Sequence, residues 1–430
     1  MKKRPCVSSR WCRALGIFFV SLLLCLALSS PHPAEAATVT IAKKAGAAIA
    51  IPSYASGDTL QIAGEALEVD DWIEIKALCT ENFHLVLNDA TTEIPDNALG
   101  GGSLPDENLW IMSISGPSVT RVGAQAFAYC ASLANVDLPG ASRVGLHSFA
   151  GCESLERVYM PMVTDIEGSA FGDCSSLKEL NISAVARIGD GTFGGCLLLE
   201  ELNLPAAIVV GKAAFEGCEL LKLVSMPAAR RIEEKSFENC ASLEYADLPS
   251  AQTIGRFAFR GCTPLASISL PLVQVIEGGA FHGCSSLASA FLPEVRMIGE
   301  SAFAGCASLK DVDFPMAQNI GGSAFYECVA LERANLPAAK EIEKSTFERC
   351  TFLKHVFLPS AQKIGYHAFT GCDSLILLEL GRKMPVLRHT FNGTRNSPDL
   401  IVQVPSNEDY GNWQLFGGPG KITVRSQNTP

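Results

Sequence analysis

Apolar residues recur along this chain with a period of 22 residues. In twelve successive copies, a Phe stands three residues before a Cys and a Leu stands three residues after it, without an insertion or a deletion. The twelve Cys of this frame are Cys130, Cys152, Cys174, Cys196, Cys218, Cys240, Cys262, Cys284, Cys306, Cys328, Cys350 and Cys372. A period this strict is typical of a solenoid, in which each copy forms one coil and stacks on the next.

Each copy contains one segment with the apolar spacing of a short strand. In the first regular copy, Leu133, Val136 and Leu138 face one way and Pro139 follows them. Pro ends the strand because it has no backbone N–H to donate. We expect equivalent strands to pair in parallel and in register, as one sheet along one face of the solenoid. The rest of each copy, with the Phe and the Cys, is too short for a full helix and is predicted to form a tight turn or a 3₁₀ segment.

The repeated Phe, Cys and Leu residues are predicted to form packing ladders, because no single coil can bury its apolar face alone. Representative ladder residues are Phe127, Cys130, Leu133, Phe215, Cys218, Leu221, Phe303, Cys306 and Leu309. Disulfides and metal binding are the alternatives for the Cys ladder. Neighbouring Cys lie within the Cα range of a disulfide, but their Cβ vectors should be parallel, and a linear ladder does not converge on a metal ion. We therefore predict buried free thiols.

The two ends of the chain depart from the repeat. Residues 37–93 are predicted to be an N-terminal cap, because an exposed terminal coil would show its core and an unpaired strand edge. Within this cap, residues 59–62 and 83–87 are expected to be strands, and residues 70–79 either a helix capped by Asp70 or Asp71 or an alternating strand. The solenoid spans 94–380 and begins with a degenerate repeat that has a glycine-marked insertion near residue 100. Residues 381–430 are predicted to be a C-terminal cap.

Residues 1–36 are predicted to be a secretory signal peptide. Five basic residues precede an apolar run at 14–28, and Ala34-Glu35-Ala36 fits the small-x-small cleavage pattern. The alternative is an uncleaved N-terminal anchor. No later segment has the length of a membrane span. The formal net charge of −11 becomes more negative when this segment is removed, which argues against nucleic acid and anionic membranes as partners.

The residues of catalytic and metal sites do not recur in a usable pattern. No His stands in a zinc spacing or beside a recurrent Ser or Cys partner, and the glycines near residue 100 lack the Lys of a phosphate-binding loop. Neither end region offers a nucleophile and base pair. We therefore expect a protein that is not an enzyme and that binds no cofactor and no metal.

Candidate binding residues lie at the positions that vary from copy to copy. The outward strand positions hold several large side chains, of which Tyr159, Tyr245, Phe291, His355 and Phe357 are the candidate partner contacts. Aromatic side chains on an outward sheet face suit a protein interface. Scattered exposed aromatics are also ordinary in sheets, so this interpretation depends on the positions and not on the residue type alone.

The repeat resembles the BspA-like leucine-rich repeat family of secreted and surface proteins. Its Leu-x-x-Val-x-Leu skeleton and its Ile-Gly-x-x-Ala-Phe-x-Gly-Cys-x-Ser-Leu segment carry the resemblance over residues 94–380. The position that holds an Asn ladder in many leucine-rich repeats holds Ala or Val here, as in Ala141 and Val163. The implied fold is a β-rich α/β leucine-rich repeat solenoid of 22-residue coils, with a parallel sheet along one face and a cap at each end.

The resemblance also implies a function. It points to a secreted or cell-surface adhesin-like protein, monomeric, that presents a rigid sheet face to a protein partner such as a host extracellular matrix or cell-surface protein. The alternative is a non-catalytic structural or scaffold component of the cell envelope.

Overall fold

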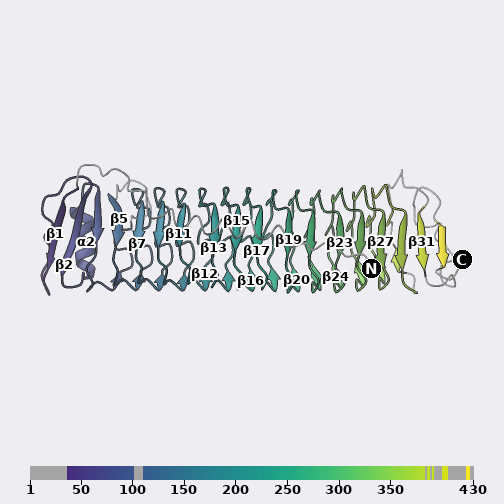
Figure 1. Ribbon diagram of the computed structural model, residues 1–430, viewed down its shortest axis with the longest axis horizontal. Helices are drawn as coiled ribbons and strands as arrows, with labels where there is room; N and C mark the ends of the chain where they lie inside the picture. The colour runs from purple at the N-terminus through teal and green to yellow at the C-terminus, as the bar shows by residue number, and fades with distance from the viewer. Residues whose placement is uncertain are drawn as a thin grey trace, which may run out of the picture.

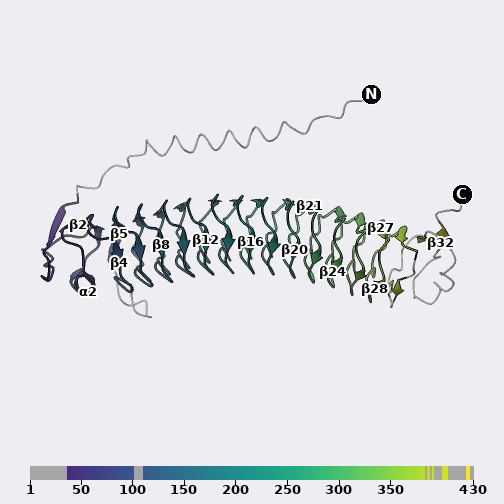
Figure 2. The same ribbon diagram turned by 90° about the horizontal axis from the view of Figure 1, so that it is seen from below.

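The protein is a long rod of stacked coils. The computed structural model describes residues 36–100, 110–382, 385–387, 390–391, 400–404 and 423–426. Successive coils follow one another along the long axis of the rod, and two rows of strands run along it (Figures 1 and 2). The predicted signal peptide lies almost entirely outside the described residues, as do the insertion after Gly100 and most of the predicted C-terminal cap. The predicted parallel solenoid is confirmed.

The long-strand face consists of one strand from each coil. Its N-terminal sheet has the strands β1 (Thr38–Lys43), β2 (Asp58–Gly64), β3 (Phe83–Val86), β5 (Ile111–Ser115), β7 (Asn135–Asp137), β9 (Arg157–Tyr159) and β11 (Glu179–Asn181). The face continues through three further parallel sheets. The first has β13 (Glu201–Asn203), β15 (Leu223–Ser225) and β17 (Tyr245–Asp247), and the second has β19 (Ser267–Ser269) and β21 (Ser289–Phe291). The third has β23 (Asp311–Asp313), β25 (Arg333–Asn335), β27 (His355–Leu358), β29 (Leu377–Leu380), β31 (Ile401–Val404) and β32 (Thr423–Ser426).

The short-strand face is a second parallel sheet, of fourteen two-residue strands. They are β4 (Glu93–Ile94), β6 (Arg121–Val122), β8 (Arg143–Val144), β10 (Asp165–Ile166), β12 (Arg187–Ile188), β14 (Val209–Val210), β16 (Arg231–Ile232), β18 (Thr253–Ile254), β20 (Val275–Ile276), β22 (Met297–Ile298), β24 (Asn319–Ile320), β26 (Glu341–Ile342), β28 (Lys363–Ile364) and β30 (Val386–Leu387). Sequence analysis missed this face, because two residues are too few for a period-2 alternation to show.

Parallel pairing keeps a constant register along both faces. On the long-strand face Val136 stands opposite Val158, and on the short-strand face Val144 stands opposite Ile166. The register between regular coils is therefore 22 residues, as the period predicts. Each position of the coil becomes a column of side chains along the rod, and the Phe, Cys and Leu columns of the regular coils are buried throughout.

The turns that join short strands to long strands contain two left-handed backbone positions in each coil. The first, with φ near +55°, is illustrated by Gln125 (φ +54°) and Ala213 (φ +51°). The second comes directly before the Cys and is often Gly, as in Gly217 (φ +72°). Left-handed φ bends the chain sharply enough to return it to the next long strand within a few residues. The predicted tight turn is therefore observed, with no helix in the described regular coils.

The N-terminal region contributes β1, β2 and β3 to the first sheet of the long-strand face, and it carries the helix α2 (Val69–Leu78). The open choice for residues 70–79 is thus settled as a helix, but the N-cap is Glu68 and not Asp70 or Asp71. Asp71 lies in the first turn of the helix. Its carboxylate accepts the Glu68 backbone N–H at 2.7 Å and pairs with Lys43 at 2.8 Å. The hydrogen bond with Asp71 raises the pKa of Lys43. This buried pair joins α2 to β1.

Candidate functional site

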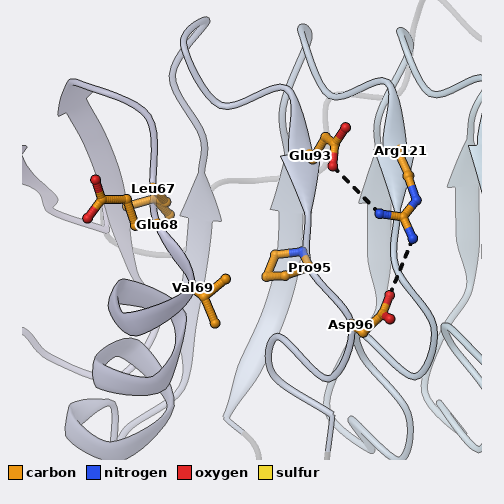
Figure 3. A pocket seen from close by; sticks show the side chains of 7 residues that line it. All are labelled: Leu67, Glu68, Val69, Glu93, Pro95, Asp96 and Arg121. Carbon is orange, nitrogen blue, oxygen red and sulfur yellow. Dashed lines mark ion pairs between the residues drawn. The ribbon is translucent and has the colours of Figure 1, made fainter.

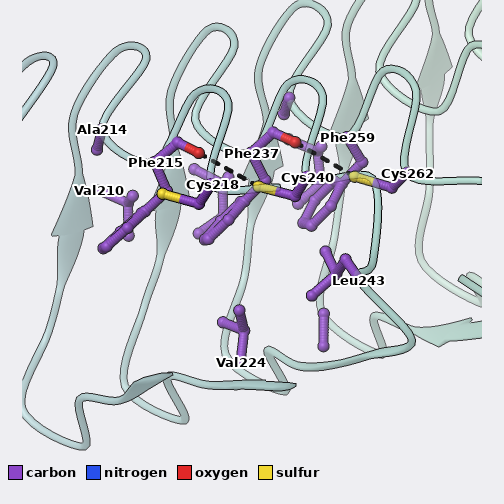
Figure 4. Packing of buried hydrophobic residues seen from close by; sticks show 14 of the residues in the cluster. Val210, Ala214, Phe215, Cys218, Val224, Phe237, Cys240, Leu243, Phe259 and Cys262 are labelled. Carbon is purple, nitrogen blue, oxygen red and sulfur yellow. Dashed lines mark hydrogen bonds between the residues drawn. The ribbon is translucent and has the colours of Figure 1, made fainter. Parts of the chain in front are cut away.

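The interior of the rod is built on a continuous stack of phenylalanine rings. Thirteen rings, from Phe127 to Phe391, stack on one another with centroids 5.1–5.6 Å apart and planes within 2–17°. The side chains of the predicted ladder residues, including Phe215, Cys218 and Leu221, have no exposed surface. Figure 4 shows Phe215 and Cys218 packed among equivalent residues of the next coils. The one-coil spacing of about 4.8 Å favours this offset stacking of parallel rings.

The cysteines of the ladder have a hydrogen-bonding role that the sequence did not reveal. From Cys152 onward, each thiol donates to the backbone carbonyl of the Phe 25 residues earlier, with Sγ to O distances of 3.0–3.4 Å. Two of these bonds, from Cys240 to Phe215 and from Cys262 to Phe237, appear in Figure 4. Each thiol therefore ties one turn to the turn before it.

The environment of these thiols makes them poor nucleophiles and poor metal ligands. All thirteen cysteines in the described part of the chain are free and buried. Burial raises the pKa of Cys218 to about 12, and it raises the pKa of Cys240 well above its ordinary value. The thiolate is the species that attacks and that binds metals, and here it is strongly disfavoured. Within the described residues, no group of three or more His, Cys, Asp or Glu side chains could hold a metal ion.

The five candidate contact residues lie on the long-strand face and point outward. Tyr159 is 47% exposed, Tyr245 45% and Phe291 59%, while His355 is exposed and Phe357 is half-buried. They come from β9, β17, β21 and β27. The structure does not gather them into one cluster, because β9 and β17 are four coils apart, which is about 19 Å. His355 and Phe357 share one strand, so a partner would have to contact several coils at once.

Charged and polar residues, which sequence analysis did not single out, accompany the aromatics along this side of the rod. Arg333 Nε lies 2.8 Å from Asp311 Oδ1 one coil earlier, and Lys354 Nζ lies 2.9 Å from Glu332 Oε2. A period of 22 residues between opposite charges could have revealed these pairs. Such exposed pairs add little stability, but they fix the charge pattern that a partner would meet.

Exposed aromatics also occur away from the sheet faces, in the turns. Tyr129, Phe352 and Tyr366 are exposed to much the same degree as the candidate contacts. The tyrosine ring of Tyr129 lies over Gly151, where a Cβ would approach the ring to 2.5 Å. Aromatic exposure alone therefore does not distinguish the long-strand face from the turns.

A recess of about 590 Å³ lies where α2 meets the first coils. Arg121 bridges two acidic residues on the coil side of the recess, with one guanidinium nitrogen 3.6 Å from Glu93 Oε2 and another 3.6 Å from Asp96 Oδ1 (Figure 3). Val69, the first residue of α2, forms the opposite wall. No Ser, Thr, Cys or His lines this recess, so it lacks the nucleophile and base of a hydrolytic site.

Comparisons with known proteins agree with this geometry. The model of the BspA-type leucine-rich repeat region matches residues 92–222, 186–295 and 274–396. A leucine-rich repeat protein from Bacteroides ovatus is 25% identical, with a TM-score of 0.53 over 78% of this chain and 91% of that chain. A leucine-rich cell surface protein from Faecalibacterium prausnitzii is 24% identical, with a TM-score of 0.40 over 74% of this chain and 92% of that chain. No curated protein matches the chain.

These matches cover the repeat array from end to end. Members of this bacterial family are typically extracellular or surface proteins, their fold is generally not catalytic, and leucine-rich repeat proteins generally mediate protein interactions. In the described part of the chain, no helix is long and apolar enough to cross a membrane. The chain belongs to the BspA-type leucine-rich repeat family.

Proposed function

We propose that this protein is a secreted or surface-displayed binding protein that uses the long-strand face to bind an extracellular protein partner. The observation that carries the proposal is the arrangement of exposed Tyr159, Tyr245 and Phe291 on the strands of one rigid face of a stacked rod. Aromatic anchors of this kind supply most of the binding energy in many protein interfaces. The predicted signal peptide supports an extracytoplasmic location, and the acidic charge favours solubility outside the cell.

The mechanism is multi-coil contact between a rigid surface and a partner. Each strand that carries a candidate anchor pairs with at least one neighbouring strand and lies between stacked coils, so the face loses little conformational freedom when it binds. The candidate anchors span β9 to β27, and a partner that contacts several of them gains affinity from contacts on separate coils. A host matrix or cell-surface protein is the class of partner that we propose.

The test replaces the anchors and compares them with matched aromatics in the turns. The triple variant Tyr159→Ala, Tyr245→Ala and Phe291→Ala should weaken binding by at least about tenfold, because one interface hot spot alone is worth about 2 kcal/mol. The control removes two tyrosines and one phenylalanine of similar exposure from the turns; these are Tyr129, Tyr366 and Phe352.

The measurement is surface plasmon resonance against an immobilised panel of extracellular matrix and cell-surface proteins. Circular dichroism verifies that both triple variants keep the fold. Binding that falls only in the long-strand variant supports the proposal. If no panel member binds the parent protein, a scaffold role becomes the better account. If both variants weaken binding equally, the long-strand face is not the binding site.

A further inference from the structure

A pocket of about 610 Å³ opens in the turns at the coil that contains Gly278 and Gly279. In the preceding coil the same two positions hold Arg256 and Phe257, and in the following coil the first of them holds Glu300. The two glycines have no side chains, so the larger neighbours become the walls of a notch. We refer to this pocket as the glycine notch.

Phe257 forms an aromatic wall of the glycine notch. Its φ of +56° lies in the left-handed region, which a bulky side chain rarely adopts. Its ring occupies the space that Gly279 leaves open, since a Cβ on Gly279 would lie 2.3 Å from two ring carbons. The guanidinium carbons of Arg256 and Arg260 lie 4.7 Å and 5.2 Å from the ring centroid. One strained aromatic residue thus holds two cations at the notch.

The two guanidinium groups differ in their ion pairs. Arg260 Nη1 lies 3.2 Å from Glu238 Oε1, so its charge is partly offset. Arg256 makes no ion pair with any residue that the structure describes. Glu300 faces the same notch, but its carboxylate lies 3.5 Å from Lys344 Nζ. Arg256 is therefore the cation that is available to an anionic ligand.

Other coils of this protein show that a carboxylate can accept the backbone N–H at the coil position of Gly278. In five coils the backbone N–H at the position of Gly278 donates to a carboxylate of the protein. These pairs are Ala124 with Asp96 (2.8 Å), Leu146 with Glu167 (3.1 Å), Lys212 with Asp190 (2.9 Å), Arg256 with Glu277 (3.0 Å) and Gly322 with Glu343 (2.9 Å). In three of the five, the carboxylate is a Glu 21 residues later.

Gly278 lacks this carboxylate. The residue 21 positions later is Gly299, and the Gly278 N–H has no acceptor among the described residues. Several other residues at this coil position also have an N–H without an acceptor among the described residues; they are Gly168, Asp190, Glu234, Glu300 and Lys344. Gly168 is the one glycine among them, and its neighbours at the same position of the adjacent coils are Leu146 and Asp190. An external carboxylate can therefore take the place that Glu277 occupies one coil earlier. Only at Gly278 would it also meet two guanidinium groups in the same pocket.

We propose that the glycine notch binds the carboxylate of an acidic side chain presented by a peptide segment of a protein partner. One carboxylate oxygen accepts the Gly278 N–H, and the other accepts from the Arg256 guanidinium, which is suited to this planar group. Arg260 adds positive charge, and the Phe257 ring packs against the methylene groups of the ligand. The notch is in the turns and not on the long-strand face, so this inference does not depend on the proposed function.

A peptide fits this lining better than an acidic sugar. Sugar hydroxyl groups would need several neutral hydrogen-bonding side chains. The lining of the notch provides two, Ser301 and His282, which is too few. An acidic side chain needs only the cation, the backbone N–H and an apolar wall. A sugar acid is therefore the competing ligand that the experiment must separate.

The test is an amide-resolved NMR titration of the protein with a short peptide that contains two adjacent Glu residues. The Gly278 amide signal should shift saturably, because its N–H gains a charged acceptor, while the Gly168 signal should not. A peptide with Gln in place of Glu should cause no shift. Arg256→Gln should weaken the peptide about tenfold, because a hydrogen bond to a charged group is worth about 1.5–3 kcal/mol.

The matched control is Arg187→Gln, which removes an exposed Arg in β12 that makes no ion pair in the described chain. This control should leave the titration unchanged. The proposal is wrong if Gly168 and Gly278 shift alike, if the Gln peptide binds as well, or if Arg256→Gln has no larger effect than Arg187→Gln. An oligomer of galacturonic acid that saturates the site at lower concentration than the peptide would also overturn it.

Discussion

Raising the pH above about 9 is expected to unfold this protein over a narrow pH range, because the ladder thiols cannot ionise in the folded state. Burial raises the pKa of Cys130, Cys174 and Cys284 to about 12, from an ordinary value of 9.0. In the unfolded chain the same thiols lose their protons near the ordinary value. The folded state then holds more protons than the unfolded state, so its stability falls as the pH rises.

The expected size of this effect comes from the number of thiols. Each one lowers the free energy of unfolding by about 1.4 kcal/mol for every pH unit between its unfolded and folded pKa. Twelve ladder thiols together give roughly 16 kcal/mol per pH unit. That slope exceeds the whole stability of a typical domain, which is about 5–15 kcal/mol. Below the unfolded pKa the thiols are neutral in both the folded and the unfolded state. Their ionisation therefore takes nothing from the free energy of unfolding at neutral pH.

The measurement is the urea midpoint of unfolding from pH 7 to pH 10 with a reductant present. The variant Cys218→Ala, Cys240→Ala and Cys262→Ala removes three of the twelve thiols, so its alkaline slope should be smaller by about a quarter. This comparison separates the thiols from lysine and tyrosine, which also titrate at high pH. A midpoint that stays constant from pH 8 to pH 10 would show that the thiols are not buried as neutral groups.

Phe259→Ala should lower the free energy of unfolding by about 3–5 kcal/mol, because it removes a buried ring and leaves a cavity. The Phe259 ring has no exposed surface and stacks on Phe237 and Phe281, with centroids 5.2 Å and 5.3 Å away. The substitution interrupts the ring stack near the middle of the rod. In a repeat protein the coupling between neighbouring coils holds the array together, so the two halves should begin to unfold separately.

The measurement is urea unfolding followed by circular dichroism and by hydrogen exchange. The parent protein should unfold in fewer steps than the Phe259→Ala variant. The control is Phe352→Ala, which removes an exposed ring from a turn and should change the stability by no more than about 0.5 kcal/mol. Equal losses from the two substitutions would contradict the account of the ring stack.

The sequence predicted the features that depend on the period. The spacing of 22 residues determines the register, and it places Leu133, Val136 and Leu138 inside and Tyr159 outside. It could not predict the short-strand face, because segments such as Arg143–Val144 carry no alternation of their own. The first left-handed position of each turn was hidden for a different reason. Residues as different as Gln125 and Phe257 occupy the same backbone position, so composition gave no signal.

The features that were missed at the candidate sites depend on contacts between coils. The bond from Cys240 to the Phe215 carbonyl joins residues 25 positions apart, so the Cys and the Phe of one copy do not show it. The glycine notch depends on three successive coils and on the glycine at position 299. The N-cap of α2 is Glu68, and Asp71 completes a capping box with it while also pairing with Lys43 of β1, a contact between residues far apart in the sequence.

The central claim is that the repeated Phe, Cys and Leu hold the fold together, and that binding belongs to the positions that vary. Alkylation followed by mass spectrometry tests it most directly. In the native protein at neutral pH, we predict that the twelve ladder thiols stay unlabelled. After unfolding without a reductant, Cys79 and all twelve should be labelled. A disulfide between ladder cysteines, or rapid labelling of a ladder thiol in the native state, would contradict the claim.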